Sequence, residues 1–279
     1  MSTNYGIPKK HVKTIAITSG KGGVGKTNIT ASLAIAMQKL GKKVLVMDAD
    51  LGLSNIDILL GLTPQYNIKH LLDGSRTLRE VVVEGPCGIK VLPAGGGIQE
   101  LTRIDEFQRL QLIEAFDAYD SDIDVLLIDT GAGISSNVTF FCAAVEEVVV
   151  ITSQEHTALA DAYGLIKVLY SEYQENKFNV LINSVKDKSE ADEVFSRLTR
   201  ATERFLSLSL DYLGYLPYDE AVKRSVLAQR AFVEMYPRNF ISKCILELAA
   251  NLLEREPRIT GRIQVGLGNL WASRAGEPG

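Results

Sequence analysis

The sequence predicts an α/β fold, namely a doubly wound and mostly parallel sheet with helices on both faces. Short runs rich in Val, Ile and Leu alternate along the chain with longer segments of helical periodicity. Strands that are buried on both faces of a parallel sheet contain such continuous apolar runs. A crossover between two parallel strands needs a segment about as long as a helix. The regular alternation of the two kinds of segment is typical of doubly wound sheets.

The expected strands are the apolar runs, and the expected helices are the segments between them. The strands are Thr14–Thr18, Val44–Asp48, Ile89–Leu92, Asp124–Asp129, Glu147–Thr152, Phe178–Asn183 and Tyr212–Leu216. The helices are Lys26–Leu40, Asp105–Tyr119, Ser135–Ala144, Ala158–Tyr173 and Ser189–Ser207. Because no internal repeat or low-complexity tract interrupts this series, we expect one domain over residues 13–255. Residues 1–12 form an N-terminal extension, and residues 256–279 form a C-terminal tail.

Composition limits the class of protein. The chain has 279 residues, of which 46% are hydrophobic and 23% charged, as in ordinary globular proteins. Its net charge of −4 gives no overall attraction to nucleic acid, so we do not expect direct nucleic-acid binding. The three cysteines are far apart and lack the spacing of a zinc or redox motif. The sequence contains neither a secretory signal nor a run of about 18 apolar residues, so we expect a cytoplasmic protein.

The run Ser19–Thr27, which reads SGKGGVGKT, joins the first expected strand to the first expected helix. It contains the phosphate-loop pattern G-x-x-x-x-G-K-[ST] in the structural context that this pattern requires. Lys26 is expected to contact the β- and γ-phosphates of a nucleotide, and the Thr27 hydroxyl to bind Mg²⁺. The sequence therefore predicts a site for ATP or ADP with Mg²⁺. Its expected nucleotide-binding residues here are Gly20, Gly22, Gly23, Val24, Gly25, Lys26, Thr27 and Asn28.

Acidic residues follow two further strands. Asp48 and Asp50 end the second expected strand, and Asp129 ends the fourth. Carboxyl ends of parallel strands meet at one edge of the sheet, so these carboxylates should lie near the phosphate loop. We expect Asp48 and Asp129 to support Mg²⁺, since burial of Asp129 without such compensation would be costly.

Glycines follow both groups of acids and indicate mobile backbone. Two acids followed by Gly52 suggest a first switch that comprises Asp48, Asp50 and Gly52. A second switch would comprise Asp129 with Gly131 and Gly133, where the backbone can move when the γ-phosphate leaves.

The loop also contains a second lysine, Lys21, which cannot easily fold back onto phosphates held by its own chain. In this respect the sequence resembles the deviant Walker A family of P-loop NTPases, of the SIMIBI type, which includes MinD, ParA and the nitrogenase iron protein. The resemblance implies an ATP-dependent homodimer in which Lys21 reaches the partner's nucleotide. It also implies that Lys21, Lys26 and Asp50 are catalytic, with Asp50 orienting the attacking water. Asn183, Pro217 and Asp219 match the positions at which that family binds adenine.

Longer segments are similar to one branch of this group. Ser19–Thr30, Asp48–Pro64, Asp129–Ser135 and Asp161–Leu169 resemble FlhG, also called FleN or YlxH, a family that limits flagellar number and placement. The resemblance implies an ATPase switch whose partners are the FlhF GTPase, components of the flagellar switch or C-ring, or a flagellar transcription regulator. Family members that stimulate FlhF carry an N-terminal D-Q-A-x-x-L-R type motif. Residues 1–12 contain no such motif, so the resemblance does not extend to stimulation of FlhF through that element, whereas binding of FlhF by another surface stays open.

The tail carries an apolar stripe. Five residues fall within roughly a third of a helical wheel, beside Arg258 and Arg262. They are Ile259, Ile263, Leu267, Leu270 and Trp271. The stripe resembles the membrane-targeting tail of MinD-like proteins and predicts reversible association with the inner membrane. Three glycines in this segment weaken a helix, which leaves the alternative that the tail packs on its own domain.

Other functions remain open at this level. The loop and switches are shared with ParA-like DNA or plasmid partition ATPases and with MinD-like regulators of the cell-division site. A partition protein would need a basic surface, for which Lys223, Arg224 and Arg230 are the nearest candidates. A metabolic kinase or amidoligase would need an acceptor pocket, which the sequence does not indicate.

Overall fold

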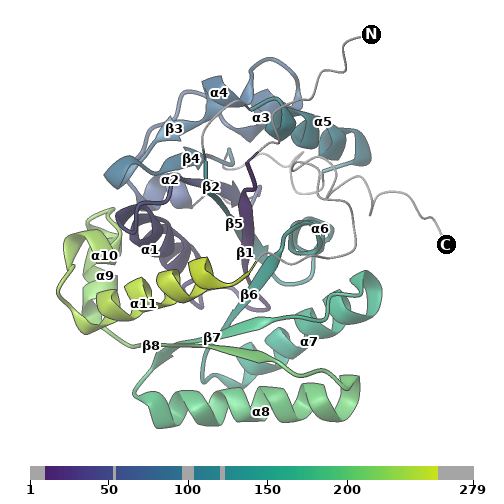
Figure 1. Cartoon of the computed structure of the whole chain (residues 1–279), viewed down its shortest axis with the longest axis vertical. Coiled ribbons are helices and arrows are strands. Elements are labelled where there is room, and N and C mark those ends of the chain that lie inside the picture. The colour runs from purple at the N-terminus through teal and green to yellow at the C-terminus, as the bar shows by residue number, and fades with distance from the viewer. Residues whose placement is uncertain (1–9, 53–54, 96–103, 120–122, 257–279) are drawn as a thin grey trace.

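The computed structural model describes residues 10–52, 55–95, 104–119 and 123–256 (Figure 1). Within these ranges, eight strands form one sheet in the order β3-β4-β2-β5-β1-β6-β7-β8. Neighbouring strands are parallel, except that β3 runs antiparallel to β4. The predicted fold class is thereby confirmed. The tail stripe and residues 1–9 lie outside the described residues, so the expected domain bounds stay a prediction.

The strands agree with the apolar runs to within a few residues. They are β1 Lys13–Ser19, β2 Val44–Ala49, β3 Val83–Glu84, β4 Lys90–Leu92, β5 Val125–Ala132, β6 Glu147–Thr152, β7 Asn179–Val185 and β8 Asp211–Pro217. Every residue of β1, β2 and β6 is buried, because helices cover both faces of the sheet. Strand β5 extends three residues past Asp129, and Ala132 pairs with Ser19 across a register shift.

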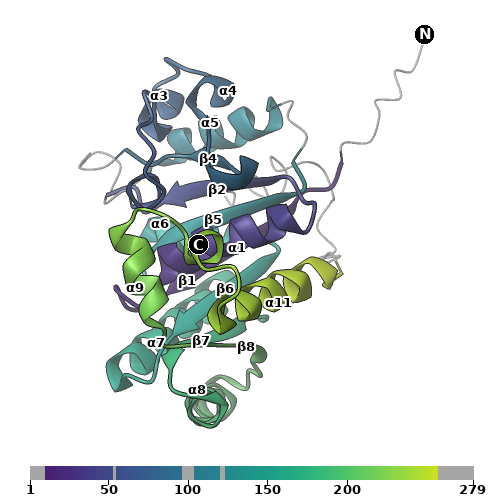
Figure 2. The ribbon, with the colours of Figure 1, turned by 90° about the vertical axis from the view of Figure 1, so that its left-hand side faces the viewer.

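Helices occupy both faces (Figures 1 and 2). They are α1 Lys26–Lys39, α2 Ile56–Leu59, α3 Ile68–Leu72, α4 Leu78–Val81, α5 Glu106–Asp117, α6 Ser136–Ala144, α7 His156–Tyr173, α8 Lys188–Leu206, α9 Glu220–Leu227, α10 Phe232–Met235 and α11 Phe240–Glu254, with a 3-10 turn at Pro86–Gly88. Helices α1, α10 and α11 pack with Ile15 and Ile17 on one face. Helices α5 to α8 pack with Ala16 on the other, since successive strand residues point to opposite faces.

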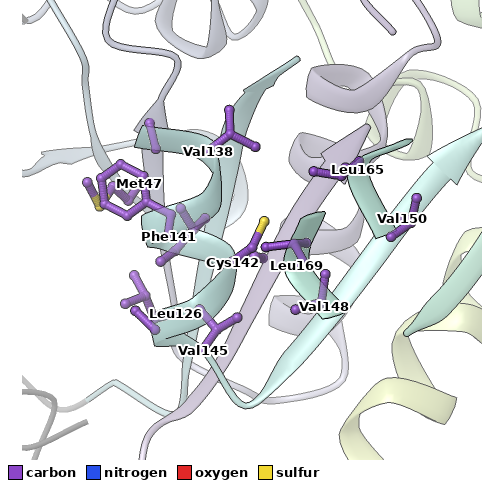
Figure 3. Packing of buried hydrophobic residues seen from close by; sticks show 14 of the residues in the cluster. Met47, Leu126, Val138, Phe141, Cys142, Val145, Val148, Val150, Leu165 and Leu169 are labelled. Carbon is purple, nitrogen blue, oxygen red and sulfur yellow. The ribbon is translucent and has the colours of Figure 1, made fainter. Parts of the chain in front are cut away.

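Helices α6 and α7 lie side by side on one face of the sheet (Figure 3). Its Phe141 and Cys142 are fully buried and pack in one cluster with Leu126, Val148 and Leu169. Burial raises the pKa of the Cys142 thiol to about 12. This dry packing fixes α6 and α7, whose amino ends both face the edge that holds the phosphate loop.

Strand β3 and helices α2, α3, α4, α9, α10 and α11 were not predicted from the sequence. Strand β3 has two residues, too few to show an alternating pattern. Helix α11 has clear apolar spacing, but no strand follows it, so the strand–helix alternation gave no reason to place it. In the described ranges, no helix is long and apolar enough to cross a membrane.

Candidate functional site

The phosphate loop follows the central strand β1, and two glycines determine how closely it is packed. A Cβ atom on Gly20 would lie 2.1 Å from the backbone of Asp161 in α7. One on Gly25 would lie 2.6 Å from Nδ2 of Asn183, and Gly25 also has a φ of 92°. Glycine is therefore required at both positions by close approach, and at Gly25 by its left-handed backbone as well.

The start of α1 is suited to an anion. Gly25 caps this helix without a side-chain hydrogen bond, and its first turn carries no acidic residue within the described structure. The backbone N–H groups and the positive end of the helix dipole are thus available to phosphate. Nearby, Asn183 Nδ2 donates to the Val24 carbonyl at 2.7 Å and braces the loop. The buried Oδ1 of Asn28 has no hydrogen-bond partner among the described residues. The backbone N–H donors at the start of α1 fit the phosphates of a nucleotide.

Asp129 lies in the second half of β5, beside the loop, and is 1% exposed. Its carboxylate accepts a hydrogen bond from Thr30 Oγ1 at 3.0 Å. Burial raises the pKa of Asp129, while the charge of Lys26 and the hydroxyls of Thr27 and Thr30 oppose this rise. The predicted Mg²⁺ residues Thr27 and Asp129 are therefore together, next to the lysine that should contact phosphate.

Asp48 is paired in register with Asp129 on the neighbouring strand β2 and is fully buried. Burial raises the pKa of Asp48 to about 7, and the nearby Asp129 adds to the effect. Backbone N–H groups of Asp50, Asn55 and Ile56 donate to its two oxygens at 3.0 to 3.2 Å. Asp48 thus anchors the first switch and the start of α2. Its expected contribution to Mg²⁺ binding stays a prediction.

The two expected switches lie side by side. A Cβ atom on Gly131 would be 3.5 Å from Oδ1 of Asp50, so the carboxylate lies against the second switch. Gly133, with a φ of 90°, donates its N–H to the Ser19 carbonyl at 2.9 Å. Gly52 ends the described part of the first switch. Tertiary folding therefore joins Asp50, the second switch and the phosphate loop.

Lys21 is turned toward α7 of its own chain. Its ammonium donates to the Glu155 carboxylate and, at 2.8 Å, to Thr157 Oγ1. Sequence reasoning did not identify Glu155 or Thr157 as site residues. The available signal was their position directly after β6, at the edge of the sheet where the loop lies.

The expected base-binding residues are only partly brought together. Asn183 reaches the loop, whereas Pro217 pairs with Val185 at the end of β8. Asp219 Oδ1 accepts the N–H of Ala221 at 2.8 Å and thereby caps α9. The adenine role of these three residues stays a prediction.

A phosphate loop at the centre of a parallel sheet, with buried carboxylates on the adjacent strands, defines a P-loop nucleotide hydrolase. Residues 15–232 match the model of the CobQ/CobB/MinD/ParA nucleotide binding domain. The chain is 43% identical over 228 residues to the antiactivator FleN of Pseudomonas aeruginosa. This match covers 82% of this chain and 81% of the relative. It is 34% identical over 248 residues to the flagellum site-determining protein YlxH of Helicobacter pylori, covering 88% and 84% respectively.

A solved structure shows the same fold. The septum site-determining protein MinD from Pyrococcus horikoshii, complexed with Mg-ADP, superimposes with a TM-score of 0.72 at 23% identity. The match covers 87% of this chain and 96% of that one. The chain therefore belongs to the FleN/YlxH family, also called FlhG, within the MinD/ParA ATPases, and it is an ATP hydrolase.

Proposed function

We propose that this ATPase is a molecular switch that controls the number and placement of flagella. The observation that carries the proposal is the phosphate loop beside Asp129, together with the loop lysine Lys21, which contacts α7 instead of turning back over its own loop. The two flagellar relatives support the cellular role. ATP joins two chains face to face, and hydrolysis separates them.

Each site residue has a defined task in this cycle. Lys26 would hold the β- and γ-phosphates, and Thr27 and Asp129 would hold Mg²⁺. Mg²⁺, when bound, neutralises phosphate charge. Asp50 orients the attacking water. Because its carboxylate lies against Gly131, the second switch responds when the γ-phosphate is lost. Lys21 of each chain stabilises the nucleotide of the other.

DNA partition is less well supported. Of the three candidate basic residues, Arg230, which lies between α9 and α10, already pairs with Glu234 of α10 at 2.6 Å. Lys223 and Arg224 alone form a small basic surface, whereas non-specific DNA binding uses several phosphate contacts.

The cellular role is tested by deleting the gene in the source organism and restoring it as wild type or as Lys26→Ala. We expect an altered number of flagella per cell, which only the wild type restores, as counted by electron microscopy. Normal flagella combined with loss of plasmids or chromosomes would establish the partition function instead.

Partners are tested by co-purification with and without ATP. Because the Pseudomonas relative is an antiactivator, a flagellar transcription regulator is the first partner to test, followed by the FlhF GTPase and C-ring components. We expect ATP-dependent capture by wild type and none by Lys26→Ala.

A further inference from the structure

The first turn of α7 holds the loop lysine by two side chains. Glu155 immediately precedes the helix and pairs with Lys21, and Thr157 accepts a second hydrogen bond at 2.8 Å. The carboxylate of Glu155 makes no capping hydrogen bond to α7, although residues at this position often cap the helix. Its carboxylate is directed to Lys21 instead.

The backbone fixes this geometry. Gly20, directly before Lys21, lies so close to α7 that a Cβ atom would be 2.1 Å from the Asp161 backbone. The loop therefore starts against α7, and a lysine one residue later reaches the first turn of that helix. The side chain of Lys21 is 35% exposed and that of Glu155 is 63% exposed, so the pair lies at the surface and can open.

We propose that Glu155 and Thr157 form a latch that retains Lys21 within its own chain until a partner's nucleotide competes for it. The latch rests on the proposed function, in which Lys21 acts across a dimer. In this proposal Lys21 leaves Glu155 when it reaches a partner's phosphates, so the two contacts compete for one ammonium group. A surface ion pair is weak, so the greater charge of a triphosphate displaces it. The latch thereby raises the concentration at which ATP-bound chains pair.

Replacing Glu155 with Gln should promote dimerisation. Both latches must open when a dimer forms, so the fold-change for one latch is squared in the dimer dissociation constant. Loss of one exposed ion pair changes an equilibrium about two- to fivefold, which predicts a dimer dissociation constant about 4- to 25-fold lower. Sedimentation velocity of the full chain with the non-hydrolysable analogue AMPPNP and Mg²⁺ measures it. The affinity of the monomer for AMPPNP should not change, because Glu155 is not assigned to the nucleotide.

Two further variants separate the latch from general charge effects. Thr157→Val should shift dimerisation in the same direction but less, since it removes a neutral hydrogen bond. Glu172→Gln removes an exposed charge from the last turn of the same helix and should behave as wild type.

The outcomes are distinct. If Glu155→Gln dimerises as wild type does, or less readily, the latch is overturned while the dimer stands. If wild type remains monomeric and Glu155→Gln forms dimers, the latch is supported in its strongest form. If both remain monomeric with AMPPNP, the proposed dimer itself is wrong, and the latch with it.

Discussion

At the scale of single residues, burial determines the protonation behaviour of the two carboxyl groups at this site. Asp48 and Asp129 lie side by side on adjacent strands, and desolvation raises the pKa of both carboxyl groups. Lys26 and the hydroxyls around Asp129 oppose this rise, so the loop and the carboxylates stabilise each other. The pattern of strand ends indicated these residues, but only the structure shows that Asp48 is held by three backbone N–H groups.

At this scale we predict that Lys26→Ala abolishes nucleotide binding. The variant loses the charged contact to the β- and γ-phosphates, for which a reduction in affinity of about 30-fold or more is expected. Isothermal titration with ATP and Mg²⁺ measures it, with the exposed Lys167→Ala as control. Unchanged affinity would show that the loop does not hold phosphate.

Cys142 gives a pH prediction. Its folded pKa is raised from 9.0 to about 12, so the folded state retains the thiol proton that the unfolded state loses. Stability from this group is therefore present below pH 9 and is lost as pH rises toward 12. Between pH 8 and pH 10, the free energy of unfolding measured with urea should fall by about 1 kcal/mol more in wild type than in Cys142→Ala. Cys87 is exposed, and Cys87→Ala should retain the wild-type loss.

At the scale of elements, helix α7 contacts the phosphate loop at two adjacent residues, Gly20 and Lys21. It supplies the wall against which Gly20 packs and the first-turn residues that hold Lys21. Helix α6 packs beside α7 on the same face of the sheet and helps to keep this wall in place. A movement of α7 would therefore change the position of Lys21 before it changed the rest of the loop.

Gly20→Ala tests this contact. The added methyl group meets backbone, which cannot turn away, so we expect destabilisation of about 1–3 kcal/mol and weaker nucleotide binding. Gly164→Ala, in α7 and outside the predicted nucleotide-binding residues, is the control, because no described atom beyond its neighbours and its own helix lies within 4 Å of the added Cβ. Thermal melting with and without ATP compares them. Equal melting temperatures would mean that the loop does not depend on α7.

On the scale of the whole molecule, the phosphate loop and the end of α11 lie at opposite edges of the sheet. Lys13, the first residue of β1, donates to the Arg255 carbonyl at 2.6 Å, and Arg255 in turn donates to Asn179. These contacts fix the end of α11 at the amino edge, whereas the phosphate loop follows the carboxyl end of β1. Two chains paired at their nucleotides would therefore leave both tail starts away from the interface.

Asp50→Ala should trap the ATP dimer. The substitution removes water orientation while the phosphate contacts remain, so hydrolysis should fall about 100-fold or more. Phosphate release and gel filtration with ATP measure the two effects. Normal hydrolysis, or a monomer in ATP, would contradict the role of Asp50. Asp50→Asn, which retains the shape, should be similarly slow.

The tail prediction concerns membranes. Burial of five large apolar side chains offers about 1.5–3 kcal/mol each, less the cost of ordering a segment that contains glycine. Two tails on one dimer add avidity, so binding to anionic vesicles should require both ATP and the tail. Co-sedimentation of the intact chain and of a chain ending at Pro257 measures this. Equal sedimentation of both, in either nucleotide state, would mean that the tail does not bind membrane.

The sequence by itself determined the parallel fold, the phosphate loop and the acids near the carboxyl ends of β2 and β5. These features depend on local pattern, namely continuous apolar runs, a loop of fixed spacing, and strand ends that share one edge. Tertiary structure alone decided the contacts of Asn183 with the loop, of Asp50 with Gly131, and of Lys21 with Glu155. Each joins residues from separate strand–helix units, and their distance depends on how helices pack on the sheet, which no local pattern specifies.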